Sequence, residues 1–105
     1  MDKVEILILR NLIHNEEYLR KVVPFIKSDY YEDFNQKILF EEILKFVQEY
    51  NEPPTKEVLC IEVEKRSDIN DSSFKEITQL ISYLEDAPTD FDWLVDTTEK
   101  WCRDR

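Results

Sequence analysis

The sequence predicts an all-α protein, a compact bundle of five to six helices around one central amphipathic helix. The stretch 35–51 carries apolar residues at helical spacing, and shorter stretches with the same spacing flank it on both sides. The chain contains no glycine, which disfavours sheets joined by tight hairpin turns. Its 105 residues are enough for one domain with a modest core.

The central helix is predicted from the apolar residues that recur at i, i+3, i+4 and i+7 within 35–51. They form one stripe about 160° wide, made of Leu39, Phe40, Ile43, Leu44, Phe46, Val47 and Tyr50. Glu41 and Lys45 are expected to pair on the opposite side, and Pro53 and Pro54 end the helix. The core is predicted to hold Leu39, Phe40, Ile43, Val47, Leu80, Ile81 and Leu84.

Two helices are predicted before the central one. The stretch 3–14 is apolar around most of its circumference; a buried strand is the alternative for its first half, but the pattern continues through Ile13 and favours a helix. A chain of this size is expected to cover one face of that helix and leave the other for a partner. Asn15 is expected to cap a short helix over 16–23 that Pro24 ends, before a loop or helical turn over 25–33.

Three further helices are predicted after Pro54. Thr55 can cap a helix over 56–66, although residues 59–64 also alternate as a strand does. A turn over 67–72, with an Asp or Ser cap, precedes a helix over 74–86. The last helix begins near Asp90 and continues to Arg105 with its periodicity intact and no end signal, so we expect the sequence to be part of a longer protein.

Composition excludes several classes of function. The net charge is −10, and no window clusters the lysines and arginines that a duplex-binding surface needs, so direct nucleic-acid binding is disfavoured. No apolar run approaches the ~18 residues of a membrane span, and without glycine the chain has no Walker A loop. Cys60 and Cys102 are interpreted as reduced, partly buried thiols, and the chain as cytoplasmic.

Residues that could carry chemistry have simpler interpretations. His14 is the only histidine and is expected on the solvent side of a helix end. The acidic cluster has no calcium-loop pattern and is expected to serve capping; its members are Asp86, Asp90, Asp92 and Asp96. Glu41 and Glu42 are expected on a solvated face. We therefore predict no catalytic, cofactor or metal site, and Trp93 remains open between packing and exposure to a partner.

The order of these segments resembles the N-terminal domain of DnaB-type replicative DNA helicases, in the phage T4-type branch. The most specific portion is LISYLEDAPTDFDWLVDTTEKW, over 80–101. The matching positions are Tyr18, Lys21, Val22, Pro24, Ser28, Tyr30, Val47, Glu49, Tyr50, Pro54, Leu80, Ile81, Ser82, Leu84, Pro88, Trp93, Leu94, Val95, Glu99 and Lys100. The first three residues and the turn over 67–72 depart from the family pattern.

The resemblance implies a helical collar domain over 1–89 and, over 90–105, the start of a terminal helix or hairpin that leads to an absent motor domain. It implies a hexameric, NTP-driven 5′→3′ DNA helicase of the primosome as the parent, with ATP or GTP and magnesium bound only in that motor domain. It also implies other copies of the domain, primase and, as a further candidate, a helicase loader as partners.

Two hypotheses follow. The first is a non-catalytic assembly and partner-docking domain of a phage replicative helicase, in the host-cell cytoplasm. The second is a freestanding acidic helical adaptor or inhibitor of phage origin, which the net charge mildly favours. Under the first, the predicted partner interface contains Ile6, Leu9, Ile13, Trp93, Leu94 and Trp101.

Overall fold

The computed structural model describes residues 3–105, and these form six α-helices and two short 3-10 helices, with no strand among them. The elements are α1 (Val4–His14), α2 (Glu16–Val22), η1 (Val23–Phe25), η2 (Ser28–Tyr30), α3 (Phe34–Tyr50), α4 (Lys56–Glu64), α5 (Asp71–Tyr83) and α6 (Phe91–Arg103). The all-α prediction is confirmed, and the two strand alternatives, over 4–9 and 59–64, are excluded. No helix of this described part is long and apolar enough to cross a membrane.

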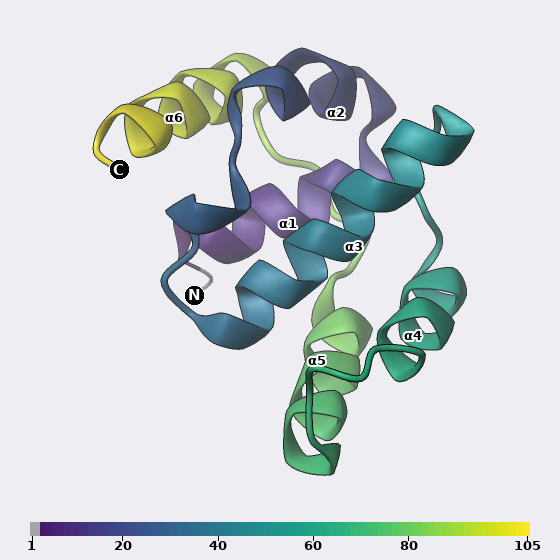
Figure 1. The fold of residues 1–105 in the computed structure, drawn as a ribbon. Coiled ribbons are helices and arrows are strands. Elements are labelled where there is room, and N and C mark those ends of the chain that lie inside the picture. Colours follow the sequence, from purple (N-terminus) through teal and green to yellow (C-terminus); the bar gives the residue numbers. More distant parts are fainter. Residues whose placement is uncertain (1–2) are drawn as a thin grey trace.

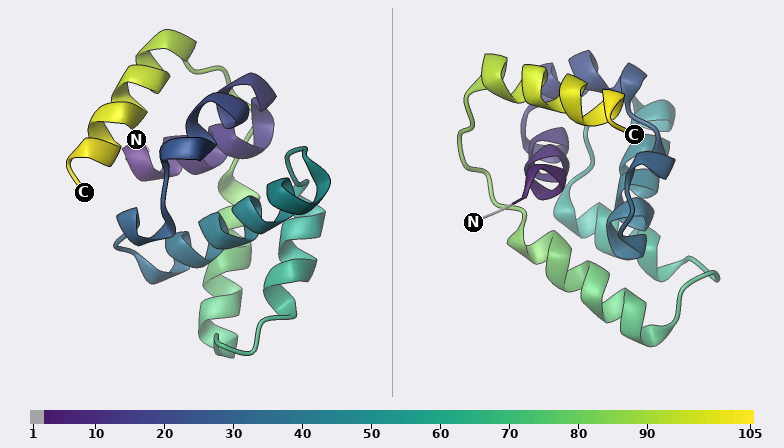
Figure 2. Two further views of the ribbon diagram at one scale, coloured as in Figure 1. Left: turned by 45° about the horizontal axis from the view of Figure 1, so that its top comes forward. Right: turned by 90° about the vertical axis from the view of Figure 1, so that its left-hand side faces the viewer.

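The helices are arranged in three levels, with α1 and α3 in the middle (Figure 1). Helices α2 and α6 pack together above them, and α4 and α5 form a hairpin below (Figures 1 and 2). Helix α3 packs against α1, α4, α5 and η2, which confirms its predicted central place.

Side-chain caps start most of the helices where the sequence predicts them. Asn15 Oδ1 accepts from Tyr18 N at 3.0 Å, and Thr55 Oγ1 accepts from Val58 N at 3.2 Å. Asp90 Oδ1 accepts from Trp93 N at 2.9 Å, as expected. The cap of α5 differs from the prediction: it is Asn70 rather than an Asp or Ser, and α5 therefore begins three residues before Phe74.

Helix α3 ends just before an asparagine, at a position where many helices have glycine. Asn51 adopts a left-handed conformation with φ 57°, which asparagine tolerates better than other non-glycine residues. The Arg20 guanidinium donates to the Asn51 carbonyl at 2.8 Å and to its Oδ1 at 3.1 Å. This contact fixes α2 to the turn between α3 and α4.

Most of the predicted core is buried as one cluster. Leu39, Phe40, Ile43, Ile81 and Leu84 are at most 1% exposed. Val47 and Leu80 are only partly buried and pack against this cluster, so the prediction that they are buried with the others is wrong for these two. Helix α5 ends at Tyr83 rather than near Asp86, yet Leu84 still turns inward as the first residue of the α5–α6 connection.

The α5–α6 connection, residues 84–90, lies along α1. His14 Nε2 donates to the Leu84 carbonyl at 2.7 Å, and Arg10 Nη2 donates to Thr89 Oγ1 at 2.8 Å. His14 is thus half-buried between two elements, which corrects its predicted place on the solvent side. The connection and α6 together cover the side of α1 that was expected to remain free.

Candidate partner-binding surface

The structure places most of the six predicted interface residues inside the domain. Leu9 and Leu94 are fully buried, and Ile13 and Trp101 are each 7% exposed. These four residues belong to the core, because α2, α3 and α6 enclose α1 on its apolar sides. Ile6 is partly buried against the same cluster. Trp93 alone of the six is well exposed, at 49%.

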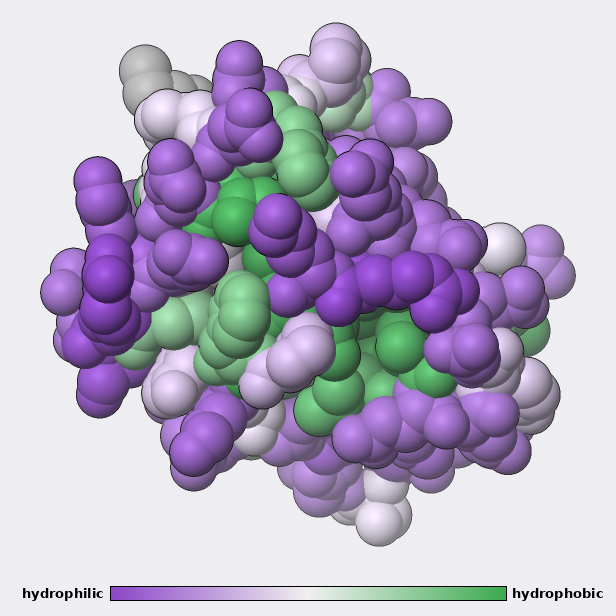
Figure 3. Space-filling view, turned by 90° about the horizontal axis from the view of Figure 1, so that it is seen from above, coloured by the Kyte–Doolittle hydropathy of each residue, from purple (hydrophilic) through white to green (hydrophobic). Residues whose placement is uncertain are grey.

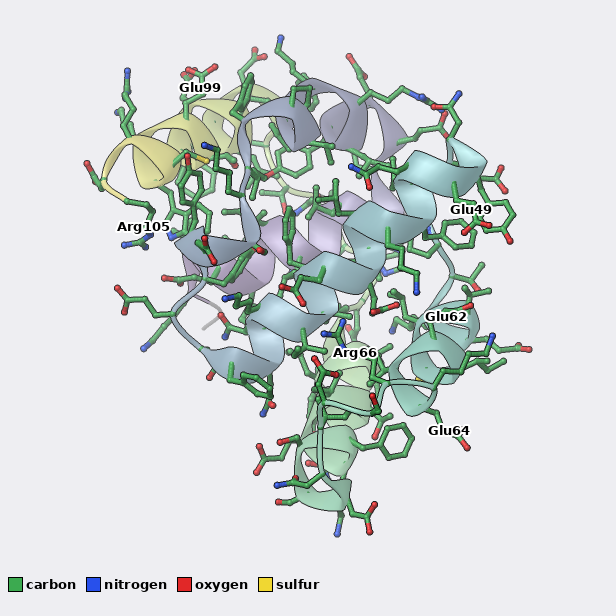
Figure 4. The ribbon with its side chains drawn as sticks, in the orientation of Figure 1. Glu49, Glu62, Glu64, Arg66, Glu99 and Arg105 are labelled. Atoms are coloured by element: carbon green, nitrogen blue, oxygen red, sulfur yellow. The ribbon has the colours of Figure 1, made fainter. Side chains whose placement is uncertain are left out.

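Trp101 anchors the end of α6 to the rest of the domain. Its ring lies 4.9 Å from that of Tyr31 and 6.1 Å from that of Tyr30, measured between centroids. The Arg105 guanidinium lies over the Trp101 ring, 4.8 Å from its centroid, and pairs with Glu5 at 3.5 Å. Trp101 is therefore a packing residue. Arg105 lies at the same end of the molecule as Glu99 (Figure 4).

The surface around Trp93 is acidic. Asp90, Asp92 and Asp96 surround it on the first turns of α6 and are all exposed. No ion pair within residues 3–105 engages Asp92 or Asp96, and no group in that range could hold a metal ion. Asp90 fulfils its predicted capping role. Of the two alternatives for Trp93, packing inside the domain and exposure at the surface, the structure shows exposure.

A hollow of about 370 Å³ lies between η1 and the C-terminal half of α6. Its lining is mainly apolar, and it comprises Phe25, Tyr30, Glu99, Cys102 and Arg103. Seen from above, the face built by α2 and α6 shows hydrophobic residues between charged ones (Figure 3). The sequence pattern missed this hollow, because Phe25 ends the short 3-10 helix η1, where no helical periodicity predicts that its side chain is 41% exposed.

An ionic cluster at the other end of the molecule was also missed. Arg66 Nη1 lies 2.6 Å from Glu42 Oε2, and Arg66 Nη2 lies 3.1 Å from Glu41 Oε1 and 2.7 Å from Asp68 Oδ2. Glu42 is 4% exposed, so the predicted solvated face is wrong at this position. The predicted Glu41–Lys45 pair is replaced by these contacts, with Lys45 instead 3.8 Å from Glu42. Arg66 lies between α3 and α5 (Figure 4), and it joins the α4–α5 turn to α3.

Burial favours the neutral form of the two thiols and of the Tyr18 hydroxyl. Burial raises the pKa of the Cys60 and Cys102 thiols, which disfavours the reactive thiolate, and neither cysteine forms a disulfide. Burial likewise raises the pKa of the Tyr18 hydroxyl far above its ordinary value. These shifts fit side chains that pack within the domain, and they mark no reactive group.

Comparison with known proteins gives the domain its context. No family model matches the chain. A DnaB-like replicative helicase of Enterobacteria phage T4 is 35% identical to it over 99 residues, which is 94% of this chain and 21% of the relative. The chain thus spans about one fifth of the length of the curated relative that it matches. The predicted resemblance is confirmed: nearly the whole chain is similar to one part of a DnaB-like replicative helicase.

Proposed function

We propose that this chain is a non-catalytic assembly and partner-docking domain of a DnaB-like replicative DNA helicase. The observation that carries the proposal is the similarity over 94% of the chain to a segment covering 21% of a replicative helicase. A segment that is all-helical over residues 3–105 and lacks glycine throughout contributes no Walker A loop. The motor, with its ATP or GTP and magnesium, would then lie elsewhere in the parent.

The surface of the domain supports a role in binding other proteins. Trp93 is exposed on an acidic helix, and an apolar hollow opens on the same helix. Tryptophan is enriched among the residues that dominate interface energies. The partners proposed are other copies of the domain in a hexameric ring, then primase and a helicase loader. Single-stranded DNA is not among them, because the net charge of −10 opposes contact with phosphates.

The rival function is a freestanding acidic adaptor or inhibitor. Its support is the net charge of −10, which suits a basic protein partner. The two functions differ in what the gene encodes after Arg105. Reading that gene decides between them: the helicase domain requires a linker and a downstream G-x-x-x-x-G-K-[ST] loop between a strand and a helix. A stop codon directly after Arg105 would favour the adaptor.

A further inference from the structure

We draw no further inference here: the strongest candidate, the hollow of about 240 Å³ at the turn of the α4–α5 hairpin, where the exposed acidic residues Glu64 and Asp71 lie beside Ile69 and Phe74, is an acidic surface for which nothing in the described residues shows what covers it.

Discussion

The Arg66 guanidinium lies 2.6 Å from the carboxylate of Glu42, which is 4% exposed in the middle of α3. Arg66 is the second residue after α4, so this pair joins the α4–α5 hairpin to the central helix. Glu42 Oε1 has no hydrogen-bond partner within the described residues, and Arg66 is therefore the main group that compensates this buried charge. Removal of Arg66 should therefore show how much this ion pair contributes to the stability of the domain.

We predict that Arg66→Ala lowers the free energy of unfolding by about 3 kcal/mol, because it leaves the buried Glu42 carboxylate with only the exposed Lys45 ammonium, 3.8 Å from Glu42 Oε1. Urea denaturation followed by circular dichroism measures the loss. The double variant Glu42→Leu with Arg66→Met serves as the control, and it should recover most of the stability, since an apolar pair of similar volume carries no desolvation cost. A loss below about 0.5 kcal/mol in Arg66→Ala would show that water already compensates Glu42.

The hydroxyls of Tyr18 and Thr98 lie 2.6 Å apart in the core between α2 and α6. Thr98 Oγ1 donates its only proton to the Leu94 carbonyl, so the Tyr18 hydroxyl is the donor between the two. Thr98→Val keeps the shape but leaves the Tyr18 hydroxyl unpaired, and it should cost about 1–3 kcal/mol of unfolding free energy. Adding Tyr18→Phe should return stability toward wild type; a further loss of the same size would contradict this hydrogen bond.

Stability should fall in acid through Asp68. Its hydrogen bond to Arg66 lowers the pKa of the carboxyl below its ordinary value of 3.8. A carboxyl with a lowered pKa in the folded state adds stability above its unfolded pKa and loses it as the pH falls through the folded pKa. Asp68→Asn should therefore lower the thermal midpoint at pH 6 and change it little near pH 2. An equal decrease at both pH values would contradict a contribution from the charge.

The domain should not bind single-stranded DNA appreciably at physiological salt. Its net charge is −10, and most of its lysines and arginines are dispersed among carboxylates. Fluorescence anisotropy of a labelled oligonucleotide should remain flat up to tens of micromolar protein. Micromolar affinity that weakens steeply with added salt would show a basic groove that the distribution of charge does not reveal.

The sequence was sufficient for the fold where one local rule dominated. The i, i+3, i+4 pattern predicted α3 to within one residue at each end, and the capping residues Asn15, Thr55 and Asp90 set three helix starts. It was insufficient wherever a distant segment decided the environment. Glu42 is polar by type and buried only because Arg66 reaches it from another element.

The candidate surface shows the same limit. Periodicity identified Trp93 as lying off the apolar stripe, and it is exposed. Periodicity also suggested that α1 had an uncovered side, but the connection over 84–90 lies along α1 through contacts to Arg10 and His14 that no local pattern encodes. The hollow beside Phe25 forms where η1 packs near α6, and these elements are about 75 residues apart in sequence. Contacts between such distant segments depend on how the whole core packs, so no local pattern predicts them.

Removal of residues 1–105 from the proposed parent helicase tests the central claim most directly. Native mass spectrometry would count the subunits in each assembly, and NTP hydrolysis per subunit would be measured on the same samples. An assembly domain without chemistry predicts that the shortened protein retains its basal hydrolysis per subunit and loses stable rings. Intact rings together with a loss of basal hydrolysis per subunit would contradict it.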